Sequence, residues 1–423
     1  MTTALILLAL VALLLVGIPV AFALGGLALG LMWVADLAPV IVPQALYGSI
    51  DNFVLLSVPL FLLMSNVLLK GGIGRDLFGA VQSWVGHWPG GLAIATVITC
   101  ALFSAIAGSS IATAATIATV AIPEMIGRGY NRPFVLGLLA AGGTLGILIP
   151  PSIPMIVYGV ITDQSIIDLF LAGIGPGLLL AGMFALYSLA YARFGGNFAP
   201  LPKASWDERA RATTRALPTV VLAFIVIGGI YAGVFTPTEA AAIGFAVALI
   251  IVFALRTMTW EKLKQAVMES MRTTVTIFLI MAGAAIFGKV ITLYRIPQDI
   301  SAAIGANIGE PGLFILIVCV VLLVVGFFLE SMSMLLIMVP VLYPSLMALG
   351  IDPIWFGIIF VVMIECALIT PPVGLNLFVI QAVADAPITE VLRGVWPFIL
   401  IMFTAVVAIY FVPDIALYIP FKL

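Results

Sequence analysis

The stretch Thr-Leu-Gly-Ile-Leu-Ile-Pro-Pro-Ser-Ile-Pro, at Thr144–Pro154, lies in a strongly apolar segment that an α-helix cannot cross intact. Two adjacent prolines remove two backbone donors, and their rings clash with the preceding turn. The residue before each proline is also displaced from helical backbone angles. A related stretch, Leu-Ile-Thr-Pro-Pro-Val-Gly-Leu-Asn, occurs at Leu368–Asn376. We therefore predict two interrupted helices, with break 1 at Thr144–Ser152 and break 2 at Thr370–Asn376.

The composition is that of a membrane protein. Of the 423 residues, 64% are hydrophobic and 9% are charged, and the mean hydropathy is +1.30. Soluble globular proteins are about 45–50% apolar and about 25% charged. We therefore predict an all-α polytopic membrane protein. Lipid offers no hydrogen-bond partners to the backbone, so a broken helix is tolerated only inside protein or beside a cavity. Two such breaks in one chain indicate a functional site.

The charge, the residue types and the motifs of the sequence exclude several classes of function. The net charge is −2, so the chain lacks the excess of basic residues that is typical of nucleic-acid binding. His87 is the only histidine, so most histidine-based metal sites and catalytic triads are ruled out. The sequence contains no phosphate-binding G-x-x-x-x-G-K-[ST] motif. We expect neither an enzyme nor an organic cofactor.

Apolar spans and charged linkers divide the chain into four parts. Residues 1–50 are expected to form N-terminal scaffold helices, with a split at Gly17–Pro19 and a less hydrophobic connection that contains Pro39 and Pro43. The other three parts are a first repeat at 51–195, cytoplasmic linkers with two connecting scaffold helices at 196–272, and a second repeat at 273–423.

The two breaks belong to an internal repeat. When the chain is shifted by 221 residues, Pro150-Pro151 falls on Pro371-Pro372, and Gly173 falls on Gly394. The shared double proline, and the preserved order of further matches, favour a true repeat over chance. Each copy is expected to hold a re-entrant hairpin followed by a broken helix. The hairpins lie at about 91–127 and 312–349, and the broken helices at about 134–167 and 353–384.

Basic residues predict the orientation of the two repeats. Charged stretches at Arg193–Arg215 and Arg256–Arg272 are separated by two spans, so they lie on one side, which the positive-inside rule makes cytoplasmic. Tracing the spans from there inverts the second repeat relative to the first and places the N-terminus in the periplasm. This topology leaves 14 of the 17 Lys and Arg residues inside. Those outside are Lys289, Arg295 and Lys422.

The polar turns of the hairpins are candidate ligand-binding segments. Tip 1 is Gly108-Ser109-Ser110, and tip 2 is Glu330-Ser331-Met332-Ser333. The uncharged tip 1 favours a re-entrant hairpin, although two full spans would return the chain to the same side. Hydroxyls and freed carbonyls suit an alkali cation, while helix N-termini favour an anion. Inverted-repeat secondary transporters bind ion and substrate in such elements. The structural alternative is that small residues allow close helix packing.

Two acidic residues lie at membrane depth in the second repeat. Glu330 and Glu365 are both flanked by apolar segments, and an ionisable group there is a functional candidate by default. The alternative is that each carboxylate supports the site from behind by accepting backbone N–H bonds and holding the hairpin shut. The sequence favours neither interpretation.

Four ordered segments resemble one known family. They are Gly108–Ala114, Gly146–Ser152, Val234–Ala240 and Ile369–Leu375. They resemble the large membrane subunit (DctM type) of tripartite ATP-independent periplasmic transporters, and the resemblance covers essentially the whole chain. It implies Na⁺ coupling and an elevator mechanism, in which a transport domain of hairpins and broken helices slides against a scaffold. It also implies a P-type periplasmic protein that delivers an organic anion and a small four-helix Q-type membrane subunit. About two spans precede the first repeat, so we expect the small subunit to be separate.

The same resemblance implies where ligands bind. Sodium, the only metal expected, would use the tips and breaks, at positions that match Ser109, Ser110, Pro150, Ser152, Ser331, Ser333, Thr370 and Val373. The predicted substrate-binding region consists of Gly108, Thr144, Gly374 and Asn376. Asn376 is expected to face the cavity because it follows the second break.

The prediction for function is sodium-coupled import of a small organic anion across the bacterial inner membrane. The nearest alternative is a sodium/dicarboxylate symporter of related fold that needs no binding protein. A third reading is a membrane assembly subunit without a transport path. The sequence leaves the solute open among C4-dicarboxylates, sialic acid, other sugar acids and ectoine-like compounds.

Overall fold

The computed structural model describes residues 2–195, 201–307, 310–372 and 374–422. Within these ranges the chain is helical and contains no β-strand. Eight of the helices described are long and apolar enough to cross a membrane, or nine if Arg132–Leu148 and Ile153–Thr162, which are bent by 40°, count as one span. The predicted all-α polytopic architecture is therefore confirmed.

The N-terminal part contains one helix more than the sequence predicts. The chain turns at Gly17, where φ is +88°, as expected from the Gly17–Pro19 split. Within the less hydrophobic connection that contains Pro39 and Pro43, Ile41–Ile50 is helical, because Pro43 lies in the first turn, where no backbone donor is required. The elements here are α1 (Thr2–Leu15), α2 (Val20–Val34), α3 (Ile41–Ile50), the 3₁₀ turn η1 (Phe53–Leu56), α4 (Ser57–Lys70) and α5 (Ile73–Val85).

The next five helices contain tip 1 and break 1. Two residues, Gly108 and Ser109, separate the antiparallel pair α6 and α7, and four residues separate α8 from α9. The bounds are α6 (Gly91–Ala107), α7 (Ser110–Gly127), α8 (Arg132–Leu148), α9 (Ile153–Thr162) and α10 (Ile166–Phe194).

The middle of the chain contains its longest helix. The elements are α11 (Trp206–Tyr231), α12 (Pro237–Ala254), α13 (Trp260–Leu293) and α14 (Ile296–Asn307). The boundary predicted between residues 272 and 273 falls inside the 34-residue helix α13. That boundary is therefore not the end of a helix, because the charged stretch up to Arg272 and the apolar span after it continue as one helix. The division into repeats stays a prediction.

The C-terminal helices contain tip 2 and break 2. Tip 2 follows α15 and opens α16, and break 2 separates α17 from α18. The bounds are α15 (Pro311–Val325), α16 (Ser331–Ala348), α17 (Pro353–Ile369), α18 (Leu375–Ala384), α19 (Ile388–Phe411) and α20 (Asp414–Lys422).

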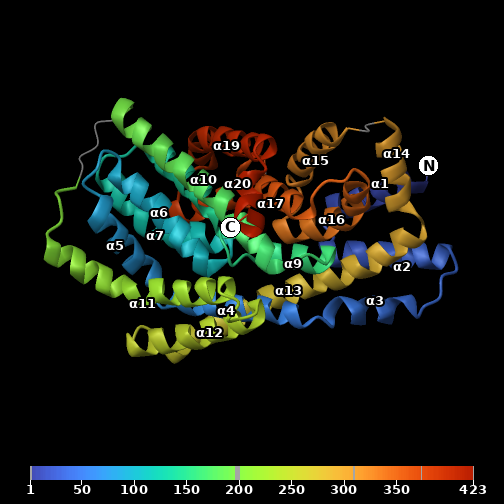
Figure 1. Cartoon of the computed structure of the whole chain (residues 1–423), viewed down its shortest axis with the longest axis horizontal. Coiled ribbons are helices and arrows are strands. Elements are labelled where there is room, and N and C mark those ends of the chain that lie inside the picture. Colours follow the sequence, from blue (N-terminus) through green and yellow to red (C-terminus); the bar gives the residue numbers. More distant parts are fainter. Residues whose placement is uncertain (1, 196–200, 308–309, 373, 423) are drawn as a thin grey trace.

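The helices are arranged in two groups along the long axis of the molecule. In Figure 1, α11, α12, α4, α13, α3 and α2 form a layer along the lower side, while the tip and break helices lie above it. Contacts agree with this grouping, because α13 packs against α2, α3 and α4, and α8 packs against α6, α7 and α19. Helix α13 also contacts α16, so the longest helix of the lower layer borders the tip 2 hairpin.

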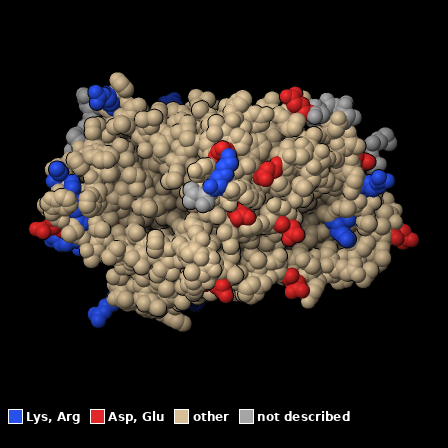
Figure 2. Space-filling view, viewed as in Figure 1, with Lys and Arg blue, Asp and Glu red and all other residues tan. Residues whose placement is uncertain are grey.

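Charged side chains are sparse on the face shown in Figure 2. Lys and Arg gather at the left end of this view, where α10 ends and α11 begins in Figure 1, and most of the remaining face is uncharged. Large apolar side chains are exposed on many helices, such as Phe224 at 77% and Leu186 at 66%. Such a surface is suited to lipid or to other apolar partners.

Helices α8 and α19 approach each other through two glycines. A Cβ placed on Gly394 would clash with the carbonyl oxygen of Pro133, and one on Gly137 would clash with the carbonyl oxygen of Gly394. Backbone therefore lies directly against backbone, which is how small residues permit close helix packing in membranes. This contact ties the helix of break 1 to the last long helix of the chain.

Gly394→Ala should therefore destabilise the protein by about 1–3 kcal/mol, because overpacking forces the two helices apart. Gly26→Ala is the matched control, since a Cβ there meets nothing within 4 Å. Thermal unfolding of the purified variants in one detergent measures the difference. Equal midpoints for the two variants would contradict this packing.

Candidate functional site

Break 1 ends one helix and caps the next. Helix α8 stops at Leu148, and Ile149 adopts extended angles (φ −85°, ψ 123°), as expected for a residue before proline. The Pro150–Pro151 peptide bond is cis. Ser152 is fully buried and caps α9, its hydroxyl accepting a hydrogen bond from Met155 N at 3.4 Å.

Break 2 has the same outline with a different cap. Thr370 precedes the prolines with extended angles (φ −94°, ψ 129°), and the Pro371–Pro372 bond is also cis. The Thr370 hydroxyl donates to the carbonyl oxygen of Cys366 at 2.5 Å. Gly374 opens α18 without a side-chain cap. Val373, a predicted sodium ligand, lies outside the described residues.

Tip 1 is packed directly onto break 1. Gly108 has φ +59°, and a Cβ there would lie 2.7 Å from the carbonyl oxygen of Pro151. On α8, a Cβ on Gly146 would lie 2.5 Å from the carbonyl oxygen of Ser109. Glycine is required at both positions, because any larger residue would separate the tip from the break. The predicted pairing of a tip with a break is therefore a physical contact in the first half.

Tip 2 is held by the carboxylate of Glu330. This side chain caps α16, accepting hydrogen bonds from Ser333 N at 2.8 Å, Ser333 Oγ at 3.0 Å and Met332 N at 3.1 Å. A carboxylate at a helix N-terminus is favoured by the helix dipole as well as by these bonds. The geometry is that of the supporting role weighed for Glu330, and the residue also borders the cavity described next.

The two tips line one cavity, which we call the tip cavity. Its volume is about 310 Å³. Gly108 and Ser109 line it from tip 1, and Glu330, Ser331 and Met332 from tip 2. Ile147, Ile153 and Pro154 beside break 1, with Leu62, Ile111 and one face of α13, complete the wall. Residues more than 200 positions apart in sequence thus share one chamber.

Arg272 of α13 lines the tip cavity and was missed by sequence reasoning. Its guanidinium forms no hydrogen bond or ion pair with any residue in the described parts of the chain, and the residue is exposed. In sequence it looked like the last member of a cytoplasmic basic stretch. Arg272 lies opposite the tips because of the path that α13 follows through the fold. An unpaired guanidinium in a cavity favours an anionic ligand, because it presents a planar set of donors to a carboxylate.

Several predicted site residues lie behind the cavity wall and not in it. Asn376 was expected to face the cavity, but it is fully buried and donates to Ser110 Oγ at 2.7 Å, because α18 turns this residue toward α7. Thr144 is also buried and donates to the carbonyl oxygen of Ala141 at 2.6 Å. The other predicted residues absent from the cavity lining are Ser110, Pro150, Ser152, Ser333, Thr370 and Gly374.

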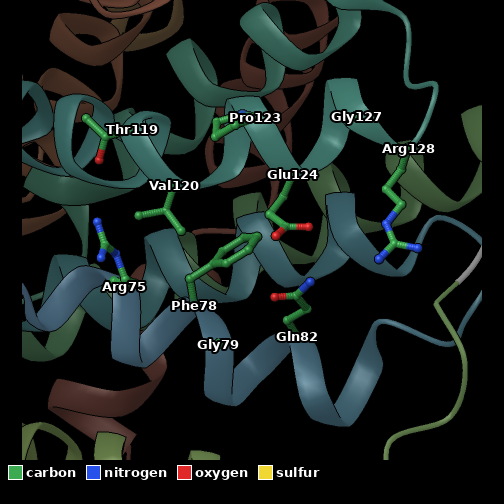
Figure 3. A pocket seen from close by; sticks show the side chains of 10 residues that line it. All are labelled: Arg75, Phe78, Gly79, Gln82, Thr119, Val120, Pro123, Glu124, Gly127 and Arg128. Carbon is green, nitrogen blue, oxygen red and sulfur yellow. The ribbon is translucent and has the colours of Figure 1, made fainter.

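Two further cavities lie elsewhere on the molecule. A groove of about 480 Å³ runs between α5 and α7, and Figure 3 shows Arg75 at one end, Arg128 at the other and Glu124 between them. No tip or break residue lines this groove. A cavity of about 590 Å³ lies between α3, α9, α13 and α16, with Lys289 in its wall. It continues along α13 from the tip cavity, because residues 272–280 line one and residues 281–292 the other.

Comparison with known proteins identifies the family. The model for the DctM component of tripartite ATP-independent periplasmic transporters matches residues 7–415. The chain belongs to this family. The resemblance of the four sequence segments is thereby confirmed, and the chain is a multi-pass membrane protein of a transporter family.

Individual relatives agree with this assignment. The C4-dicarboxylate TRAP transporter large permease protein DctM of Pseudomonas aeruginosa is 40% identical, covering 89% of this chain and 88% of that protein. The isethionate TRAP transporter permease protein DctMQ of Oleidesulfovibrio alaskensis is 36% identical, covering 96% of this chain and 64% of its own. The fold is similar to that of the Alcanivorax borkumensis YdaH transporter, with a TM-score of 0.61, 16% identity, and 99% and 98% of the two chains covered.

The cap at tip 2 gives a local prediction. Glu330→Ala should cost about 1 kcal/mol at the start of α16, which corresponds to about five-fold faster amide hydrogen exchange at Met332 and Ser333. Glu310→Ala is the matched control, because Glu310 occupies the N-cap of α15 without a side-chain cap bond. Exchange at Ser333 that is unchanged in Glu330→Ala would show that the cap contributes nothing.

Proposed function

We propose that this chain is the permease subunit that imports a small organic anion across the bacterial inner membrane, driven by sodium. The observation that carries the proposal is the tip cavity, in which the polar turns of two distant hairpins face Arg272. An ion site and an anion site would then share one chamber of about 310 Å³, a volume suited to a small solute.

The donor set around the tips fits sodium. Ser109 and Ser331 supply hydroxyl oxygens at the cavity wall, and Glu330 supplies a carboxylate beside them. These are hard oxygen ligands, and no group of three or more His, Cys, Asp or Glu side chains that would select a transition metal occurs in the residues described. Each sodium ion that moves inward across a membrane potential of −100 mV would contribute about 2.3 kcal/mol of driving force to import.

Arg272 fits the anionic solute. A charge-assisted hydrogen bond contributes about 1.5–3 kcal/mol, so one carboxylate bound here would gain about ten-fold or more in affinity. Lys289 lies 17 residues further along α13, which is about 26 Å at 1.5 Å per residue. The two cavities therefore place two basic groups along one helix, which suits an anion path.

The mechanism we propose is of the elevator type. Helices α2, α3, α4, α11, α12 and α13 would form the scaffold, and the tip and break helices would form the moving part. The moving part would take its hairpins and broken helices from the inverted repeats proposed at 51–195 and 273–423. The contact between α13 and α16 supports this division, because residues of both helices line each of the two cavities along α13. The N-terminus would be periplasmic.

Two partners and a solute class follow from the family. We propose a P-type periplasmic binding protein, because the family is named for a tripartite periplasmic system. We propose a Q-type small membrane subunit, because the Oleidesulfovibrio relative, named DctMQ, extends well beyond the part that this chain matches. A C4-dicarboxylate is the first solute to test, since the Pseudomonas relative is named for it.

Uptake into proteoliposomes tests the function. Labelled succinate should enter only with an inward Na⁺ gradient and a cognate binding protein. Ser109→Ala with Ser331→Ala should weaken the Na⁺ dependence, because two cavity oxygens are lost. Flux without any binding protein would favour the self-sufficient symporter, and absence of flux with every organic anion tested would favour an assembly subunit.

The role of Arg272 has its own test. Arg272→Gln should raise KM for the anion about ten-fold or more, because the cavity loses its one cationic side chain among the lining residues described. Arg211→Gln is the control, since it makes the same change on an exposed turn of α11. Equal KM values for the two variants would remove Arg272 from the solute site.

A further inference from the structure

Behind the tip cavity lies a buried polar cluster that joins the two halves of the chain. Ser110 on α7 donates to Glu365 Oε2 on α17 at 3.0 Å. Asn376 on α18 donates its Nδ2 to Ser110 Oγ at 2.7 Å and to the carbonyl oxygen of Ala140 at 3.3 Å. Each of these three side chains is at most 1% exposed.

Two oxygen atoms of the cluster are hydrogen-bond acceptors to which no group donates. Glu365 Oε1 and Asn376 Oδ1 are both buried and have no hydrogen-bond partner. Ser110 has only one hydroxyl proton, and it is already directed at Glu365 Oε2. An unsatisfied buried oxygen is costly, and a buried carboxylate without an opposite charge is far more so. Asn376 Oδ1 therefore lacks a donor, and the Glu365 carboxylate lacks both a donor and a compensating positive charge.

No side chain supplies that charge. Within the described residues, Glu365 forms no ion pair with any Lys, Arg or His. Arg132 of α8 pairs with Glu390, and Lys422 of α20 pairs with Asp414. The thiol of Cys366 lies near this carboxyl, and the thiol of Cys319 on α15 lies near Cys366. Neither is a cation.

We propose that Glu365, Asn376 and Ser110 form a binding site for one monovalent cation, either Na⁺ or a proton. Glu365 Oε1 and Asn376 Oδ1 are the oxygens that would receive it. Carboxylate and carbonyl oxygens bind hard cations, and the same carboxylate oxygen accepts a proton. The site is distinct from the tip cavity, because none of its three residues lines that cavity.

The position of the cluster gives the cation a role in coupling. Ser110 begins the helix after tip 1, while Glu365 and Asn376 flank break 2. A cation between them would neutralise the buried charge and hold tip 1 against the second half. This role rests on the proposed function, but binding itself can be measured without transport.

Two measurements on the purified full chain in lipid nanodiscs decide the proposal. Equilibrium dialysis with ²²Na⁺ counts the sodium ions bound per chain. Infrared spectroscopy in Na⁺ and in choline buffers detects whether a buried carboxyl is protonated, by its carbonyl stretch. The variant is Glu365→Gln, and the matched control is Glu261→Gln, which makes the same change on the exposed start of α13.

A sodium ion and a proton give different expected results in these two measurements. If the cation is Na⁺, Glu365→Gln should bind one sodium ion fewer than the wild-type chain and Glu261→Gln. If it is a proton, the sodium count should stay the same and one carboxylic-acid band should disappear in Glu365→Gln only. Unchanged sodium counts together with unchanged acid bands would overturn the proposal.

Two further variants separate this site from folding defects and from the tip cavity. If Glu365→Gln does not fold, Ser110→Ala should shift the acid band or weaken sodium binding, and no change in either would overturn the proposal. Ser109→Ala with Ser331→Ala tests the tips alone. If these tip changes abolish no sodium binding while Glu365→Gln does, the cluster stands and the sodium site proposed at the tips fails. Succinate uptake by the wild-type chain tests the proposed function separately.

Discussion

The structure depends on one constraint, which is that backbone groups freed inside a membrane must find partners within the protein. Each Pro-Pro pair stops a helix and leaves carbonyls without their usual donors. In this chain, other backbone segments pack against the first break. Gly108 lies against Pro151, and Gly146 lies against Ser109. Tip 1 is thus one of the elements that keep the first break inside the protein.

The two halves are joined more closely than two packed domains would be. The backbone contact between Gly137 and Gly394 brings α8 against α19, and the Ser110–Glu365–Asn376 cluster links α7 to α17 and α18. The tip cavity adds a third junction, because Arg272 reaches it from a helix that belongs to the opposite layer in Figure 1.

Sequence patterns predicted the breaks, the tips and the membrane class because each has a local cause. Pro-Pro dictates the break wherever it occurs, and the extended angles of Ile149 and Thr370 agree with that rule. The helix at Ile41–Ile50 was missed because Pro43 is harmless in a first turn. Arg272 and the burial of Asn376 were missed for another reason. Which side chain faces a cavity depends on helix rotation and crossing, and no local pattern determines these in a chain that is apolar on nearly every face.

The continuity of α13 has a consequence for how such a chain is assembled. Its 34 residues run without interruption from the charged stretch that ends at Arg272 into the second half of the chain. The repeated unit of the sequence is therefore not a unit that could be cut free, since any division at its start would leave half a helix on each fragment. The same uninterrupted helix gives both cavities a common wall.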